Sequence, residues 1–182
     1  DYTGTDAVVY VPAEIDGKAV TEIENEAFAY SDSLTEISLP GSLKSIGANP
    51  FAGCDCLSEI NIPKELDWIT FEEGFLTANG TKLISYISPE SKKVVVPDGV
   101  TEIGDSAFYS CESLTEIKLP ESVTTIGDSA FERCSSLTEI NLPRSLKTIG
   151  ANPFRSCDHL SKIIIPKELD WITFKDGFLI AN

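Results

Sequence analysis

Apolar and polar positions alternate in a short stretch that recurs along the chain. In one copy, Ile117 and Leu119 are apolar, whereas Glu116 and Lys118 beside them are charged. This alternation predicts a short β-strand with one face turned inward. A proline, Pro120, follows the strand and ends it. The other small or apolar positions of this copy are Leu114, Val123, Ile126, Ala130, Phe131 and Cys134.

The stretch returns at a fixed step. Copies end at Pro40, Pro63, Pro120, Pro143 and Pro166, with weaker copies ending at Pro12 and Pro97. The steps from 40 to 63, 97 to 120, 120 to 143 and 143 to 166 are each 23 residues. The step from 12 to 40 is longer by five residues, which "EIDGK" at 14–18 supplies, and the step from 63 to 97 is longer by eleven. A longer repeat is superimposed, because "SLKSIGANPF" at 42–51 and "IPKELDWITF" at 62–71 return 103 residues later.

A unit of 23 residues is too small to bury its own apolar face, but stacked units with parallel strands bury a continuous core. The sequence therefore predicts a repeat solenoid over residues 1–182. We expect seven coils, an irregular coil at about 64–97 and a truncated copy from 167. Strand alternation then creates two outward columns on one sheet surface seven strands wide. The first column is Val8, Glu36, Glu59, Lys93, Glu116, Glu139 and Lys162, and the second is Tyr10, Ser38, Asn61, Val95, Lys118, Asn141 and Ile164.

The pentapeptide "GDSAF" occurs twice, and its serines, Ser106 and Ser129, resemble hydrolase nucleophiles. The same repeat position holds Asn49 and Asn152 in two other copies and Glu26 in a fifth. Serine and asparagine share the ability to cap a helix, and proline follows both asparagines at the first helical position, where it is favoured. The pattern thus predicts short helical turns rather than an active site.

The irregular segment contains Asn79-Gly80 between two β-prone runs, a strong signal for a two-residue hairpin turn. We expect Phe75–Ala78 and Thr81–Tyr86 to form a hairpin that projects from the solenoid. Asn79 also begins a glycosylation sequon, although a turn explains it better. Trp68 and Trp171 precede the irregular segments, where packing against the hairpin or the next turn is the favoured role and a binding hot spot is the alternative.

The motif C-x-x-L-x-x-I-x-L-P-x-x-V-x-x-I-G-x-x-A-F is carried by Cys134 to Phe154, with Leu146 and Pro153 as variants. It resembles the BspA-like, or Treponema pallidum type, leucine-rich repeats over essentially the whole chain. The resemblance implies a curved solenoid, mainly parallel β on its concave face. It also implies extracellular or cell-surface bacterial proteins that bind host or matrix proteins, or other cells.

The composition limits the classes of partner that we expect. The 14 Lys and Arg against 29 Asp and Glu give a net charge of −15, so neither nucleic acid nor an anionic membrane surface is an expected partner. No apolar run reaches the roughly 20 residues of a membrane span. The chain holds no methionine, and it stops where its first copy continues into a hairpin strand. We therefore expect the native protein to continue past Asn182 and the cut end to be able to pair with a neighbouring molecule. The oligomeric state stays open.

The chemistry-bearing residues fall into repeat columns. The cysteines Cys54, Cys111, Cys134 and Cys157 share one column, which predicts a core ladder of free, buried thiols, because parallel stacking aims them the same way. The sole histidine, His159, replaces Cys56 of the earlier copy, so no Cys-His pair recurs. No metal-ligand spacing or phosphate-binding loop is present. We expect no catalytic, cofactor or metal site.

These observations favour a non-enzymatic protein-binding or adhesion module that engages its partner on the concave sheet face. The expected contact residues are Tyr10, Glu36, Glu59, Asn61, Val95, Glu116, Lys118, Glu139, Asn141, Lys162 and Ile164. A structural spacer within a larger surface protein is the first alternative. A carbohydrate-binding surface ranks lower, because only Tyr10 is aromatic in these columns, and an enzyme ranks last.

Overall fold

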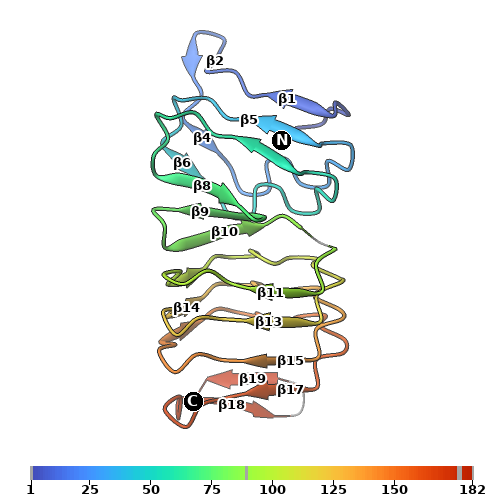
Figure 1. Ribbon diagram of the computed structural model, residues 1–182, viewed down its shortest axis with the longest axis vertical. Helices are drawn as coiled ribbons and strands as arrows, with labels where there is room; N and C mark the ends of the chain where they lie inside the picture. The colour runs from blue at the N-terminus through green and yellow to red at the C-terminus, as the bar shows by residue number, and fades with distance from the viewer. Residues whose placement is uncertain (1, 89, 176–177, 182) are drawn as a thin grey trace.

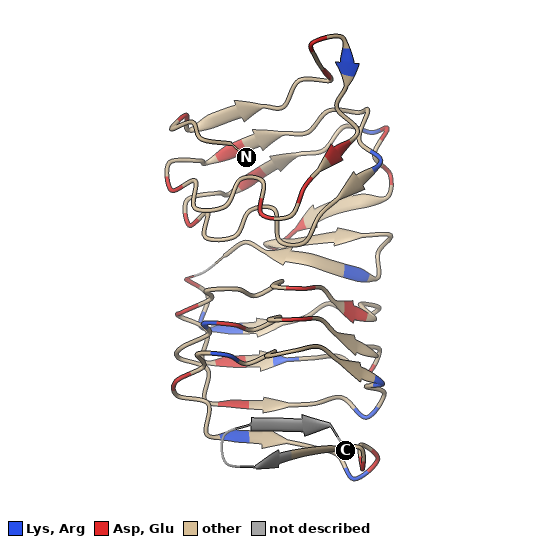
Figure 2. Cartoon of the chain, turned by 180° about the vertical axis from the view of Figure 1, so that it is seen from behind, with Lys and Arg blue, Asp and Glu red and all other residues tan. Residues whose placement is uncertain are grey.

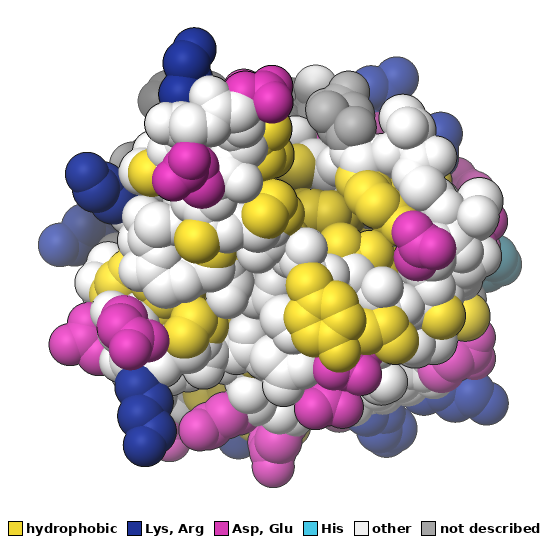
Figure 3. All heavy atoms as spheres, turned by 90° about the horizontal axis from the view of Figure 1, so that it is seen from above, with side chains coloured by type: hydrophobic (Ala, Val, Ile, Leu, Met, Phe, Trp, Pro, Cys, Tyr) yellow, Lys and Arg dark blue, Asp and Glu magenta, His cyan; other side chains and the backbone are white. Residues whose placement is uncertain are grey.

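The chain winds into an elongated stack of coils with its two termini at opposite ends (Figure 1). The structure is a computed structural model that describes residues 2–88, 90–175 and 178–181. No helix occurs among these residues, so the short helical turns expected from the sequence are not found. The end-on view shows apolar side chains in the middle and charged side chains around the rim (Figure 3).

Two faces carry the repeated strands. The long-strand face has the three-residue strands β1 (Val8–Tyr10), β5 (Glu36–Ser38), β7 (Glu59–Asn61), β11 (Lys93–Val95), β13 (Glu116–Lys118), β15 (Glu139–Asn141) and β17 (Lys162–Ile164). The short-strand face has the two-residue strands β4 (Glu22–Ile23), β6 (Ser45–Ile46), β12 (Glu102–Ile103), β14 (Thr125–Ile126) and β16 (Thr148–Ile149). It also holds β8 (Ile69–Glu72), β9 (Phe75–Ala78) and β10 (Lys82–Tyr86).

The long strands pair in parallel with the repeat register that the sequence predicted. Glu116 lies opposite Glu139, and Ile117 opposite Ile140, one repeat of 23 residues apart. The middle residue of each long strand is apolar and turned inward; Ile37 and Ile140 are fully buried. The alternation in the sequence therefore reports the two sides of one sheet.

Phenylalanines stack along the core. The rings of Phe108 and Phe131 lie 5.1 Å apart, centroid to centroid, and those of Phe131 and Phe154 lie 5.5 Å apart, both pairs at 14° between planes. In the irregular coil Tyr86 takes this place and lies 5.2 Å from Phe108. Such offset rings add to the burial of their area.

The glycine of each "IG" pair sits where the backbones of neighbouring coils meet. A Cβ atom on Gly127 would lie 2.6 Å from the Asp105 amide nitrogen, and one on Gly150 would lie 2.4 Å from that of Asp128. These distances are shorter than real Cβ contacts, so only glycine fits at this spacing.

The residues predicted to cap helices have a different role. Ser106, Ser129, Asn49, Asn152 and Glu26 all have positive φ, between 35° and 55°. A helix cap has an extended φ, so the capping interpretation is wrong. In the left-handed conformation the amide of Ser106 points at the next coil and donates to the Asp128 carbonyl at 2.9 Å. Asparagine tolerates this conformation better than most residues do.

In three copies the residue before this position, Asn25, Asp105 or Asp128, ties coils together through its side chain. The Oδ1 atom of Asp105 accepts a hydrogen bond from the Asp128 amide at 2.8 Å, and Oδ1 of Asp128 accepts one from the Ala151 amide at 2.6 Å. Asn25 accepts from the Ala48 amide in the same way, at 2.7 Å. We call this series of bonds the Asx ladder.

The irregular segment does not project. Strands β8, β9 and β10 form an antiparallel meander whose last strand pairs in parallel with β12. Phe75 and Leu83 pack into the C-terminal core cluster, whereas Leu76 and Ile84 pack into the N-terminal one. The β9–β10 pair, joined at Asn79-Gly80, thus lies between two cores and divides them. The sequence explains this position. Phe75-Leu76 and Leu83-Ile84 are pairs of consecutive apolar residues, so both faces of these strands carry apolar side chains.

Two other segments outside the regular coils form antiparallel pairs. The "EIDGK" insertion makes β2 (Glu14–Ile15) and β3 (Lys18–Ala19) around a turn at Asp16 and Gly17. Near the end of the chain, β18 (Ile172–Lys175) pairs with β19 (Phe178–Ala181). The strand β19 therefore has a partner in β18, whereas its counterpart β9 pairs with both β8 and β10.

Direct contacts join the two halves across the meander. Nδ2 of Asn49, which is 3% exposed, donates to the Ser106 carbonyl at 2.7 Å, and Oδ1 of Asn49 accepts from the Ser85 hydroxyl. The hydroxyl of Tyr30 donates to that of Tyr109 at 3.0 Å, 79 residues away. These contacts compensate for the interrupted repeat.

The glycine column can be tested by substitution. We expect Gly127→Ala to lower the free energy of unfolding by about 1–3 kcal/mol, because its Cβ must displace backbone of the neighbouring coil. Gly41→Ala is the control, since its Cβ would meet Glu65 at an ordinary 3.6 Å. Urea unfolding followed by circular dichroism measures both, and equal stability of the two variants would contradict the packing argument.

The Asn49 contacts can be isolated by a matched pair. Asn49→Ala leaves the Ser106 carbonyl and the Ser85 hydroxyl without this amide, a loss of about 1–3 kcal/mol. Asn152→Ala is the control, because Asn152 has the same positive φ and the same following proline but is exposed. Similar urea midpoints for both variants would show that only backbone conformation matters at this position.

Candidate functional site

The predicted contact residues do line one face, but not one sheet. In each half the two outward columns stack in register, for example Tyr10 with Ser38 and Val95 with Lys118. However, β1, β5 and β7 form one sheet, and β11, β13, β15 and β17 form another. The predicted seven-strand surface is therefore wrong. The cause is the meander, whose three strands all lie on the short-strand face.

The two halves of the long-strand face differ in charge. In the C-terminal half, Lys93 and Glu116 form an ion pair at 2.7 Å, and Lys162 and Glu139 form one at 2.9 Å. Hydrogen bonding to Glu116 raises the pKa of Lys93. Because these pairs are exposed and screened by solvent, they add little to the stability of the fold. They nevertheless neutralise Glu116 and Glu139, two of the four glutamates among the predicted contact residues.

The N-terminal half keeps its acidity. Glu36 lies opposite Glu59 in register, and Val8 rather than lysine follows in their column. Oε1 of Glu36 accepts a hydrogen bond from the side-chain amide of Asn61 at 2.7 Å, which holds the carboxylate in place without neutralising it. Acidic residues are distributed along the whole length of the molecule rather than gathered at one end (Figure 2).

A hollow of 640 Å³ lies on the C-terminal half of this face. It brings together four of the predicted contact residues, Glu116, Lys118, Glu139 and Asn141. The structure does not bring Tyr10 into it, because β1 belongs to the other sheet.

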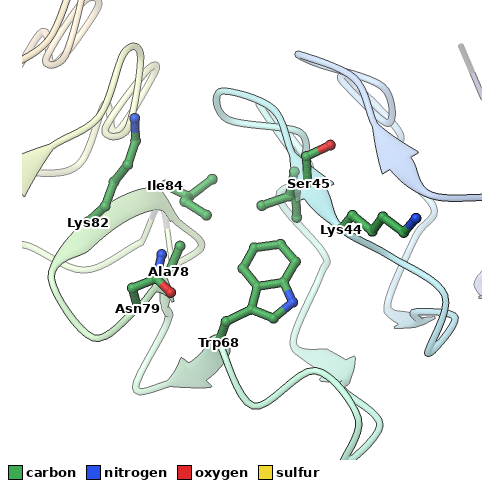
Figure 4. Close-up of a pocket in the computed structure, with 8 residues that line it drawn as sticks. Lys44, Ser45, Trp68, Ala78, Asn79, Lys82 and Ile84 are labelled. Carbon is green, nitrogen blue, oxygen red and sulfur yellow. The ribbon is translucent and has the colours of Figure 1, made fainter.

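Trp68 lies in a smaller hollow of 380 Å³ on the short-strand face. In Figure 4 its ring points between Ser45 and Ile84, while the Lys44 side chain points away from the hollow. Trp68 is half-buried and packs against the N-terminal core. The favoured packing role therefore agrees with the structure. Trp171 likewise packs against the C-terminal core.

The thiols form the predicted column and are free. The Sγ atoms of Cys54, Cys134 and Cys157 donate to phenylalanine carbonyls of the preceding coil at 2.9, 3.2 and 3.0 Å. Burial raises the pKa of Cys54 to about 11, so its reactive thiolate is disfavoured. Within this column the expected burial is wrong for Cys157, which is half-buried, and Cys56, outside the column, is exposed.

No catalytic pair forms around the histidine. Nδ1 of His159 donates to the Ser135 carbonyl at 2.7 Å, while the Cys157 thiol donates to the Phe131 carbonyl. Within the described part of the chain, no group of three or more His, Cys, Asp or Glu residues is placed to hold a metal ion. That part also contains no helix that is long and apolar enough to cross a membrane.

One cluster was missed from the sequence. Tyr30, which is 58% exposed, lies over Gly53 and meets Tyr109, and the Arg133 guanidinium carbon lies 5.5 Å from the centre of the Tyr109 ring. The hydrogen bond to Tyr109 raises the pKa of Tyr30 to about 12. Nothing in the repeat pattern indicates that residues 79 positions apart meet, because that depends on the path of the irregular segment.

Carboxylates gather beside this cluster. Burial raises the pKa of Asp55, and so do the neighbouring carboxylates of Asp32, Glu112 and Glu90. Together with Arg133 and the two serines Ser110 and Ser113, these acidic residues line a hollow of 290 Å³.

A stack of short coils with parallel strands, apolar columns and side-chain ladders defines a leucine-rich repeat solenoid. The family model for the BspA-type leucine-rich repeat region matches residues 21–85 and 84–175, in 6 copies. The chain belongs to this family.

Solved structures agree with this assignment. A leucine-rich repeat protein from Eubacterium ventriosum is 25% identical over 86% of this chain, with a TM-score of 0.73. One from Bacteroides ovatus is 31% identical over 89%, with a TM-score of 0.53. A leucine-rich cell surface protein from Faecalibacterium prausnitzii is 25% identical over 99%, with a TM-score of 0.51. This chain spans 41%, 46% and 52% of those three chains. No curated protein matches the sequence.

The carboxylate cluster predicts a pH-dependent effect. At neutral pH the charged form of Asp55 is less favourable in the folded than in the unfolded chain, because its folded-state pKa is raised. Asp55→Asn should therefore raise the thermal midpoint at pH 7. The difference should vanish near pH 3, below the unfolded carboxyl pKa of about 3.9, where both states are protonated.

Scanning calorimetry across this pH range measures the effect. Asp98→Asn, in an exposed turn, is the control for loss of one negative charge from a strongly acidic chain. A gain that is the same for both variants would assign the effect to net charge rather than to the cluster.

Proposed function

We propose that this chain is a non-enzymatic protein-binding or adhesion module of a bacterial cell-surface or secreted protein. It engages its partner, a host or matrix protein, on the long-strand face. The family supports an interaction role, and the Faecalibacterium relative is described as a cell surface protein.

The observation that carries the proposal is the place of the exposed apolar side chains. Among the described residues, five large hydrophobic side chains are exposed, and Val8, Tyr10 and Val95 of these five lie on the long-strand face. Tyr10 is 72% exposed and Val95 is 65% exposed. Tyrosine is enriched in the centres of protein interfaces. The charged columns around these residues supply the polar rim.

The proposed contact surface keeps the residues named from the sequence, with unequal roles. Glu36 and Glu59 are the docking carboxylates, because no lysine neutralises them in their column. Glu116, Glu139 and Lys162, being ion-paired, contribute shape more than attraction. Tyr10, Asn61, Val95, Lys118, Asn141 and Ile164 complete the surface.

A spacer is the second candidate, and one observation favours it. The Lys-Glu pairs of the C-terminal half make that half close to neutral, as expected of a solvated face without a partner. A spacer predicts that the isolated chain binds nothing.

The apolar contacts can be tested against a panel of purified matrix and host-surface proteins by biolayer interferometry. The chain should retain at least one panel member, and Tyr10→Ser with Val95→Ser should weaken that binding by about tenfold or more. Ile15→Ser is the control, because Ile15 is 56% exposed but lies in the β2–β3 hairpin. If the chain retains no panel member, the spacer is favoured. If Ile15→Ser weakens binding as much as Tyr10→Ser with Val95→Ser does, the long-strand face is not the binding surface.

The unequal glutamates make a second test with the same partner. Glu36→Gln with Glu59→Gln should slow association at low salt and flatten its salt dependence. Glu116→Gln with Glu139→Gln changes the net charge equally but breaks existing ion pairs. It should therefore alter the association rate less. Equal effects would show that overall charge, not this half of the face, attracts the partner.

A further inference from the structure

The hydrogen-bond ladders of the long-strand face stop between β7 and β11. In regular coils the amide before each long strand donates to the preceding coil, as from Ser58 to Thr35 at 3.0 Å and from Thr115 to Lys92 at 2.8 Å. Among the described residues, no such bond joins the Lys92 amide to the Ser58 carbonyl.

A second ladder, after each long strand, stops at the same place. The amide of Leu39 donates to the Asn61 carbonyl, and that of Val96 donates to the Lys118 carbonyl, both at 3.0 Å. The matching pair here, the Ile62 amide and the Val95 carbonyl, form no bond within the described part of the chain. Among the described residues β7 and β11 are therefore not paired with each other, and an unpaired strand edge is the arrangement to which an added strand binds.

The meander on the opposite face separates these edges. The strand order β8, β9, β10, β12 makes three steps of about 4.8 Å, or about 14 Å. One inserted strand needs two steps, about 10 Å. The separation on the short-strand face exceeds this distance by about one step, so on the long-strand face it leaves room for an added strand that pairs with one of the two edges.

A hollow lies next to the residues that precede β7 and β11. It measures about 660 Å³, and the residues that line it include Ser58, Phe71, Ile87 and Ser91 and the acidic residues Asp55, Glu73 and Glu90. The 290 Å³ hollow beside Tyr30 shares Asp55 and Glu90 with it. We call the two hollows together the seam groove.

The seam groove is predominantly acidic. Its carboxylates are Asp32, Asp55, Glu73, Glu90 and Glu112, and its one basic side chain is Arg133. Arg133 already lies over the ring of Tyr109, which shows that a guanidinium fits against an aromatic face at this place. The ring of Tyr30, exposed and fixed by its bond to Tyr109, offers a further face.

We propose that the seam groove binds an extended segment of a partner protein that carries lysine or arginine, and that this segment adds a strand between β7 and β11. The unpaired edges fit the main chain, and the carboxylates and tyrosines fit basic side chains. A second copy of this chain fits poorly, because its net charge of −15 repels an acidic groove. The residues that line the groove do not belong to the surface of the proposed function, although the added strand would lie beside Glu59, Asn61 and Val95, so the groove carboxylates and Cys56 distinguish the two proposals.

A model peptide tests the main-chain requirement. The probe is a fluorescein-labelled heptapeptide that alternates valine with lysine or arginine, measured by fluorescence anisotropy at low salt. The matched control has the same side chains but methylated amides on one edge, which removes hydrogen bonds and keeps the charge. We expect the control to bind about tenfold more weakly. Equal binding would overturn strand addition, and no binding of the probe would overturn the proposal altogether.

Protein variants locate the site. Asp55→Asn with Glu90→Gln should weaken the probe by about tenfold, because both hollows lose their shared carboxylates. Asp98→Asn with Glu65→Gln removes the same charge from exposed positions outside the groove and should leave the affinity unchanged. Equal weakening by both variants would assign binding to net charge.

Cys56 reports occupancy directly, because its exposed thiol lines the groove. The bound probe should slow alkylation of Cys56 by iodoacetamide, mapped by mass spectrometry, while half-buried Cys157 serves as the internal reference. An unchanged Cys56 rate at saturating probe would overturn the location. A dimer in sedimentation that protects Cys56 without any probe would assign the groove to a second copy instead.

Discussion

The spacing of hydrogen-bonded strands, about 4.8 Å, is the constraint on which the rest of this structure depends. Every residue in a regular coil lies one such step from its own counterpart, so only residues that tolerate themselves at that distance can occupy a column. Phenylalanine stacks on phenylalanine, and cysteine thiols donate to the carbonyls of the preceding coil. Where backbones meet, as at Gly127, no side chain fits at all.

The same constraint explains why the Asx ladder ends where it does. Asp105 and Asp128 each tie the next coil by accepting its amide, but Ala48 and Ala151 have no side-chain oxygen to continue the series. Ala48 belongs to the coil after which the regular repeat gives way to the irregular segment. There Asn49 replaces the ladder with contacts to Ser85 and Ser106. The difference between "GDSAF" and "GANPF" therefore distinguishes a coil followed by a regular copy from one followed by the irregular segment.

The sequence repeat predicted the structural features that recur in every regular coil. The inward and outward columns, the parallel register and the thiol column all follow from a step of 23 residues, and the structure has them. The left-handed residues were misread because serine and asparagine suit a helix cap as well as a positive φ, and the local sequence does not separate the two. The hairpin strands were recognised but misplaced, since a turn signal says nothing about packing. The available signal was the run of consecutive apolar residues, Phe75-Leu76 and Leu83-Ile84, which fits burial on both sides.

The candidate surfaces likewise include features that the repeat predicts and features that it does not predict. Both outward columns could be written from the sequence, and so could the ion pairs, because Lys93 and Lys162 flank the glutamates of their own column. By contrast, the meeting of Tyr30 with Tyr109 depends on how the chain crosses the meander, which no repeat encodes. A strictly periodic face presents the same few groups at every step, and such a face discriminates partners poorly, since any register of contact is almost as good as the next. Specific recognition by a solenoid must therefore rest on residues that break the period. In this chain the residues that break the period, and that we propose as contacts, are Tyr10 and Val95 on the long-strand face and the side chains gathered where β7 and β11 part.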